Sequence, residues 1–181
     1  MRIYKTETNM KVNGKKTDFA PVRTEGSQIV VAYGLKKISD ELYEWQEVEL
    51  AKTLHNQLTF DIVKTAIIAD IDDRTDAKIL NSYPFTPDGA EEPIIVWLSD
   101  ESQRNFSEAH RLQTVPVKFK LNEDAEKQPI YHTFETFEEL DRFYLGGVAY
   151  IQQCLNEGWA EKDVIDWEPY AQAIENLKPK D

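Results

Sequence analysis

Four aspartates between residues 70 and 76 are spaced closely enough to share a metal ion. The stretch DIDDRTD places carboxylates at Asp70, Asp72, Asp73 and Asp76. Clustered carboxylates are the ligands that hard cations such as Ca²⁺ and Mg²⁺ prefer. The stretch nevertheless lacks the glycine and the distal glutamate of a calcium-binding loop. Aspartate and threonine here also suit helix capping, which makes solvated or capping side chains the alternative interpretation.

The capping interpretation is the one we adopt, so we predict neither a metal site nor a cofactor. Asp72, Asp73 and Asp76 remain the candidate ligands if that interpretation is wrong. In that case the chain would be a small divalent-metal-dependent enzyme or a metal-binding protein.

The histidines and the single cysteine fit no catalytic motif. His55, His110 and His132 are far apart in the sequence and belong to no metal-binding or Cys-His pattern. With only seven glycines, the chain has no nucleophile elbow and no phosphate-cradling loop. A catalytic triad needs only spatial proximity, so the separation of the histidines does not exclude one. Cys154 lies on the apolar arc of a predicted helix, which indicates a buried residue. We predict a protein that is not an enzyme.

Two strands and a helix are predicted in the first part of the chain. Apolar side chains alternate along residues 28–38 and recur along 42–50, which predicts two strands joined by a turn at 39–41. In the second strand they fall on both faces, so either both faces are partly covered or a bulge shifts the register. The Asn13-Gly14 pair, typical of tight hairpin turns, predicts a further hairpin at residues 12–15.

The aspartates follow a predicted amphipathic helix that covers roughly residues 52–71. Its apolar side chains recur at spacings of three and four and therefore share one face: Phe60, Val63, Ile67 and Ile71. The acidic stretch 70–76 is expected to end this helix before a short helical segment at 77–80.

Short hairpins and helices alternate along the rest of the chain, bounded by turn residues and capping motifs. We predict strands at 82–85, 93–98, 116–121 and 129–134, and helices at 101–112, from Thr136 to Gly158, and from Glu168 onward.

Individual residues refine these elements. Ser99 or Asp100 is expected to cap the helix at 101–112. Gly158 is expected to end the long helix as its C′ residue. Gly147 lies on the apolar arc of that helix, where it would let a neighbouring element approach closely. The apolar run 94–98 predicts a strand covered on both faces, with Trp97 in the core.

Together these elements predict an α+β fold, an N-terminal antiparallel β hairpin module followed by helices packed on short antiparallel hairpins. The charge distribution suggests where the module ends. Residues 1–50 hold eight Lys/Arg and eight Asp/Glu, so the remainder carries the whole net charge of −12. We therefore predict an N-terminal β module over residues 1–50 and an α+β main domain over residues 51–181.

Composition also narrows the classes of partner. An acidic surface repels phosphate backbones and no basic stripe offsets it, which argues against nucleic-acid binding. The sequence has neither a run of about 20 apolar residues nor a signal-peptide pattern, so we expect a soluble, intracellular protein with no membrane contact. A single cysteine excludes an intramolecular disulfide and is compatible with a reducing compartment.

Three strings carry a family resemblance: IDDRTDAKIL at 71–80, WLSDESQRNF at 97–106 and AYIQQCLNEGW at 149–159. In order and spacing they resemble an uncharacterised domain family of phage and prophage proteins, found in tail or tail-fibre-associated chains. The resemblance covers roughly residues 63–167, and the segment 33–45 looks like a module seen beside such domains.

This resemblance transfers no active-site residue to the chain. It implies a tail-associated structural or assembly protein that acts by protein–protein contacts. The expected partners are other phage tail or fibre proteins, or further copies of this chain. The expected location is the cytoplasm of the bacterial host or the virion.

Overall fold

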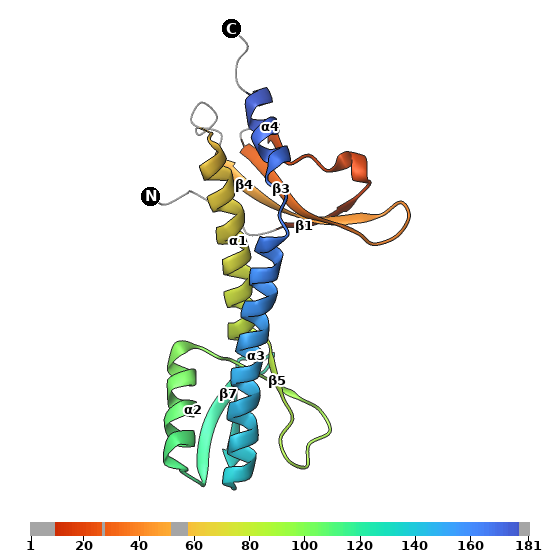
Figure 1. The fold of residues 1–181 in the computed structure, drawn as a ribbon. Coiled ribbons are helices and arrows are strands. Elements are labelled where there is room, and N and C mark those ends of the chain that lie inside the picture. The colour runs from red at the N-terminus through yellow and green to blue at the C-terminus, as the bar shows by residue number, and fades with distance from the viewer. Residues whose placement is uncertain (1–9, 27, 52–57, 178–181) are drawn as a thin grey trace. The chain divides into compact units, whose positions relative to one another are not determined.

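Helices and antiparallel strands alternate along the chain, which confirms the α+β class (Figure 1). The computed structural model describes residues 10–26, 28–51 and 58–177. These form two compact units: the first contains residues up to Asp73 and from Trp159 onward, and the second contains Arg74–Gly158. No helix within the described ranges has the length and apolar character that crossing a membrane requires.

The predicted division at residue 51 stays a prediction. Residues 52–57, just after that boundary, lie outside the described residues. The compact units are divided differently, because parts of two long helices belong with the N-terminal sheet.

The first unit contains a four-stranded antiparallel sheet with the order β1-β4-β3-β2. Its strands are β1 (Met10–Gly14), β2 (Val22–Glu25), β3 (Gln28–Lys37) and β4 (Tyr43–Ala51). The strands expected at 28–38 and 42–50 are thus confirmed as β3 and β4. The register between them shifts after Tyr33, where Gly34 has a φ of 69°. This positive φ suits glycine, and the extra residue forms a bulge in β3.

The hairpin turn predicted at Asn13-Gly14 is wrong. Both residues lie within β1, where Asn13 pairs with Glu44 and Gly14 with Tyr43 of β4. A short 3₁₀ helix, η1 (Lys16–Asp18), follows the strand. A Cβ atom on Gly14 would lie 2.7 Å from the Trp45 ring. Glycine is therefore needed here for close approach to an aromatic ring and not for a turn.

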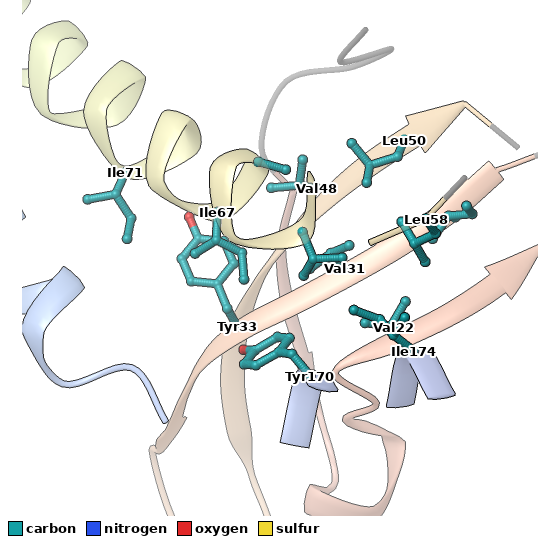
Figure 2. Close-up of a cluster of buried hydrophobic side chains, with 13 residues drawn as sticks. Val22, Val31, Tyr33, Val48, Leu50, Leu58, Ile67, Ile71, Tyr170 and Ile174 are labelled. Atoms are coloured by element: carbon teal, nitrogen blue, oxygen red, sulfur yellow. The ribbon is translucent and has the colours of Figure 1, made fainter. Parts of the chain in front are cut away.

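Helices α1 (Phe60–Asn81) and α4 (Glu168–Leu177) contribute to the core of the first unit. Figure 2 shows side chains from the sheet and from both helices gathered in one cluster. The cluster includes Ile29, Val31, Tyr33, Val48 and Leu50 from the sheet, Val63, Ile67 and Ile71 from α1, and Tyr170 and Ile174 from α4. The predicted apolar stripe of α1 is confirmed, with Phe60 partly buried at its start.

The helix break predicted at residues 70–76 is also wrong, because α1 continues to Asn81. The stretch contains neither glycine nor proline, so nothing in the backbone interrupts the helix. Asp70 is buried and accepts a hydrogen bond from the Tyr33 hydroxyl, whereas Asp72 forms an ion pair with Lys162. The aspartates are accommodated by turning to different sides of one continuous helix.

The second unit is built on two hairpins and two helices. Its strands are β5 (Tyr83–Phe85), β6 (Ile94–Val96), β7 (Val117–Glu123) and β8 (Pro129–Phe134), and its other elements are α2 (Asp100–Leu112) and most of α3 (Phe137–Asp163). The order matches the prediction. The Ser99 hydroxyl caps α2 by accepting from the Ser102 amide at 3.2 Å. The prediction that the apolar strand at 94–98 is covered on both faces is wrong, since Ile95 is 40% exposed.

Phe143 of α3 lies at the centre of the second core. Its ring centroid is 4.8 Å from those of Phe85 and Phe134 and 4.9 Å from that of Phe106. The Phe143 ring therefore contacts β5 of one hairpin, β8 of the other hairpin, and α2. Helix α2 runs alongside α3 in Figure 1.

Gly158 does not end α3, which continues to Asp163. The glycine is buried, and a Cβ atom on it would lie 2.5 Å from the Thr75 hydroxyl oxygen. The absence of a side chain thus allows α1 and α3 to approach closely within the second unit. Gly147 faces Tyr83 of β5, but a Cβ atom there would lie 3.5 Å from the ring, an ordinary contact distance, so the close approach predicted at Gly147 does not depend on glycine. Burial of Cys154 is confirmed.

Candidate functional site

The acidic stretch is spread around helix α1. Asp72, Asp73 and Asp76 are exposed, whereas Asp70 faces the core. Lys162 is the cationic partner of Asp72. Among the described residues, no group of three His, Cys, Asp or Glu side chains is placed to hold a metal ion. The metal hypothesis stays a prediction that a direct titration can test.

We expect Ca²⁺, Mg²⁺ and Mn²⁺ to leave the melting temperature of the full chain unchanged. A lysine ammonium already occupies the position next to Asp72 that a cation would take. A genuine site would instead raise the melting temperature through ligand binding to the folded state. A rise that disappears in Asp72→Asn and Asp73→Asn variants would establish the site and the alternative function with it.

Two histidines pair with carboxylates that lie on other secondary-structure elements. His110 Nε2 of α2 lies 2.7 Å from Asp141 Oδ1 of α3, and the His110 ring stacks on Tyr144 at 4.2 Å. His132 Nε2 of β8 lies 3.0 Å from Glu139 Oε1. Spacing along the chain offered no signal for these pairs, because each joins two different elements. His55 lies outside the described residues.

These pairs position elements of the second unit around α3. Glu139 is buried, and its Oε1 also accepts the backbone amide of Asp88 at 2.9 Å, which holds the β5–β6 connection against the helix. The His110–Asp141 pair joins α2 to α3 in the same way. The two histidine–carboxylate pairs therefore hold α2, β8 and the β5–β6 connection against α3.

A groove of about 860 Å³ lies between α2 and α3. It is lined by apolar and aromatic side chains from α3, α2, β5 and the β6–α2 connection, among them Tyr83, Leu98, Phe106, Phe143, Val148 and Ile151. Exposed charged residues follow one edge of α2 at successive turns: Asp100, Arg104 and Glu108. An apolar groove bordered by a charged helix edge suits the binding of a polypeptide segment.

Next to this groove, α3 exposes apolar side chains to solvent. The Leu145 side chain is 53% exposed and that of Val148 is 47% exposed, although both lie in the middle of a long helix. Exposed apolar groups that adjoin one another and a groove are typical of interaction surfaces. The groove and this part of α3 are the candidate functional site.

Tyr83 lies beneath the groove and links β5 to α3. Its hydroxyl donates to the Phe143 carbonyl oxygen at 2.8 Å. Burial raises the pKa of Tyr83 to about 12, with a small opposing effect from Arg142. The phenol is therefore held in its neutral, hydrogen-bonding form in the folded protein.

Stability should fall as the pH rises from 10 to 12. The folded-state pKa of Tyr83 is about 12, above the value of about 10 in an unfolded chain. Its stabilising contribution is therefore complete below pH 10 and is lost as the pH approaches the folded-state pKa. We expect a loss on the order of 1–3 kcal/mol.

Urea unfolding at pH 8, 10 and 11.5 measures this loss in the wild type and in Tyr83→Phe. The variant should show a smaller fall, with a remainder from Tyr170, whose pKa is also raised by burial. Equal falls in both proteins would show that Tyr83 does not contribute.

No family model matches this chain, and searches of curated proteins and of solved structures gave no match.

Proposed function

We propose that this protein is a phage- or prophage-derived, tail-associated structural or assembly component that acts through protein–protein contacts and not by catalysis. The observation that carries the proposal is the α2–α3 groove together with the exposed apolar part of α3. An open groove with an apolar lining, next to half-exposed Leu145 and Val148, is suited to a protein partner.

The resemblance to the phage tail-associated family also supports this proposal, because the resembling segments include residues of the groove. Two of the three resembling strings, residues 97–106 and 149–159, contribute residues to this groove, including Leu98, Phe106 and Ile151. The segments that resemble the tail-associated family are therefore also segments that form the candidate surface.

The proposed partner is another tail or fibre protein. A structural subunit would stay with the finished particle, in the virion. An assembly factor would bind a fibre subunit in the cytoplasm of the bacterial host and be absent from the virion. Either role uses the groove as a contact surface.

The proposal is tested by following an epitope-tagged full-length chain in its native host during particle production. Particles and free tail subunits are separated on a density gradient, and the fractions are analysed by immunoblot and mass spectrometry. We expect the chain to co-fractionate with particles or with a tail or fibre subunit. A chain that sediments free of both would overturn the proposal.

A matched pair of variants assigns the contact to the groove. Val148→Lys places a charge in the groove, and we expect it to reduce co-fractionation at least tenfold. Leu112→Lys places the same charge at the end of α2 on a side chain that is 56% exposed and does not line the groove. This control should co-fractionate like the wild type. Equal behaviour of the two variants would exclude the groove as the contact surface.

A further inference from the structure

A long part of α3 contains no charged residue. From Phe143 to Asn156 the sequence FYLGGVAYIQQCLN has no Asp, Glu, Lys or Arg, whereas 30% of the whole chain is charged. Such a segment is expected in a fully buried helix, which has no side facing water. In this protein one side of the segment faces water.

The exposed side of the segment forms a continuous line along the helix. Phe143, Gly147 and Cys154 point into the core of the second unit. On the opposite side, the exposed residues recur at spacings of four, three and four: Leu145, Ala149, Gln152 and Asn156. This spacing keeps them on one face and is the spacing through which helices pair side by side. We call this line the outer face of α3.

The two ends of the outer face are locally neutral. At one end Arg142 forms an ion pair with Asp88, and at the other Glu157 forms one with Lys78. The second unit as a whole contains eight Lys/Arg and fifteen Asp/Glu. Two copies of this unit would repel each other across most of their surface, but not across the outer face.

We propose that the outer face of α3 binds a second copy of this chain, with the two α3 helices packed antiparallel. The helix dipoles favour the antiparallel arrangement, because they then oppose each other, whereas a parallel arrangement would align them. The antiparallel arrangement also brings the Arg142–Asp88 pair of each copy toward the Lys78–Glu157 pair of the other. Because Ala149 lies midway between Arg142 and Glu157, the two-fold axis passes close to Ala149 in both copies.

The size of the outer face determines the strength of this dimer. A helical segment from 143 to 156 is about 21 Å long. A strip of that length and one helix wide covers much less than the roughly 800 Å² per partner of a standard interface. The dimer should therefore be reversible, with a dissociation constant on the order of 0.1 mM.

This inference rests on the proposed function, since it names one partner among the protein–protein contacts. It is tested on the full chain by sedimentation velocity and light scattering, from about 10 µM to 1 mM, a range that spans the expected dissociation constant. Ala149→Glu and Ala149→Lys are the key variants, because both introduce good helix formers at an exposed helical position.

Each Ala149 variant alone should have a dissociation constant at least tenfold higher than that of the wild type, since like charges meet near the two-fold axis. An equimolar mixture of the two variants should dimerise again, because opposite charges then meet. Ala77→Glu, at an exposed position of α1, is the matched control and should dimerise like the wild type.

Three results would overturn the inference: a wild-type monomer at 1 mM, a closed trimer or larger ring, or Ala149 variants that dimerise as strongly as the wild type without being mixed. Co-fractionation with tail proteins is measured separately on the same chain. Loss of self-association therefore leaves the proposed function standing, and loss of co-fractionation does not by itself remove the dimer.

Discussion

Replacing Phe143 with alanine should lower the free energy of unfolding by about 3–5 kcal/mol, the largest effect that we expect from a single substitution. The Phe143 side chain is only 1% exposed and contacts Phe85, Phe106 and Phe134 at centroid distances below 5 Å. Alanine would leave a cavity among rings from two hairpins and α2, and these elements cannot collapse together to fill it.

Chemical unfolding followed by circular dichroism measures this effect. Tyr131→Ala is the control, because it removes an aromatic ring of similar size that is 52% exposed and lies under Lys118. We expect the control to cost less than about 1 kcal/mol. A similar cost in both variants would show that the aromatic cluster is not the core of the second unit. Because Phe143 also lines the groove, its loss should weaken the co-fractionation proposed above.

Replacing Gly158 with alanine should lower the free energy of unfolding by up to about 2 kcal/mol, although alanine is the better helix former. Within a helix, the exchange of glycine for alanine alone would add about 1 kcal/mol of stability. Here the new methyl group would lie 2.5 Å from the Thr75 hydroxyl oxygen and 3.4 Å from its methyl carbon. Separating α1 and α3 to relieve this overlap costs about 1–3 kcal/mol.

Gly147→Ala is the matched control on the same helix. Its new methyl group would lie 3.5 Å from Tyr83, an ordinary contact distance. The control should therefore be neutral or stabilising by up to about 1 kcal/mol. Adding Thr75→Ala to Gly158→Ala should recover part of the loss, which a double-mutant cycle measures. A stabilising Gly158→Ala variant would show that the two helices do not need the glycine.

The groove and the outer face both depend on how α3 is held. The His110–Asp141 pair joins α3 to α2, and the Glu139 carboxylate joins it to His132 and to the β5–β6 connection. With α3 held in this way, one side of the helix faces the core, a second side lines the groove and a third side faces solvent. The two proposed contacts therefore use adjacent sides of the same helix and share Leu145 at their border.

The order of the elements of the second unit, and β3, β4 and α1 of the first, could be predicted from the sequence, because periodicity and capping are local properties. Alternation predicted β3, recurring apolar side chains predicted β4, and the spacing of Val63, Ile67 and Ile71 predicted the buried side of α1. The Ser99 cap, the hairpins of the second unit and the burial of Cys154 were predicted on the same basis. Each of these signals extends over a few residues, and each was confirmed.

Only the tertiary structure decided what individual glycines and carboxylates do. Gly14 and Gly158 carry the usual sequence signals of a turn and a helix end, yet each lies where a neighbouring side chain, Trp45 or Thr75, leaves no room for a Cβ atom. A glycine serves a positive φ or a close approach equally well, so only the distant neighbour distinguishes the two.

The candidate site could not be predicted for the same reason. Asp141 and Glu139 find their histidines 31 and 7 residues away on other elements, and the groove exists only where α2 packs beside α3. The sequence by itself determined the order of hairpins and helices in the second unit and that residues 143–156 carry no charge. The tertiary structure decided which side of that segment meets water, because packing around Phe143 turns one side inward and leaves the other exposed.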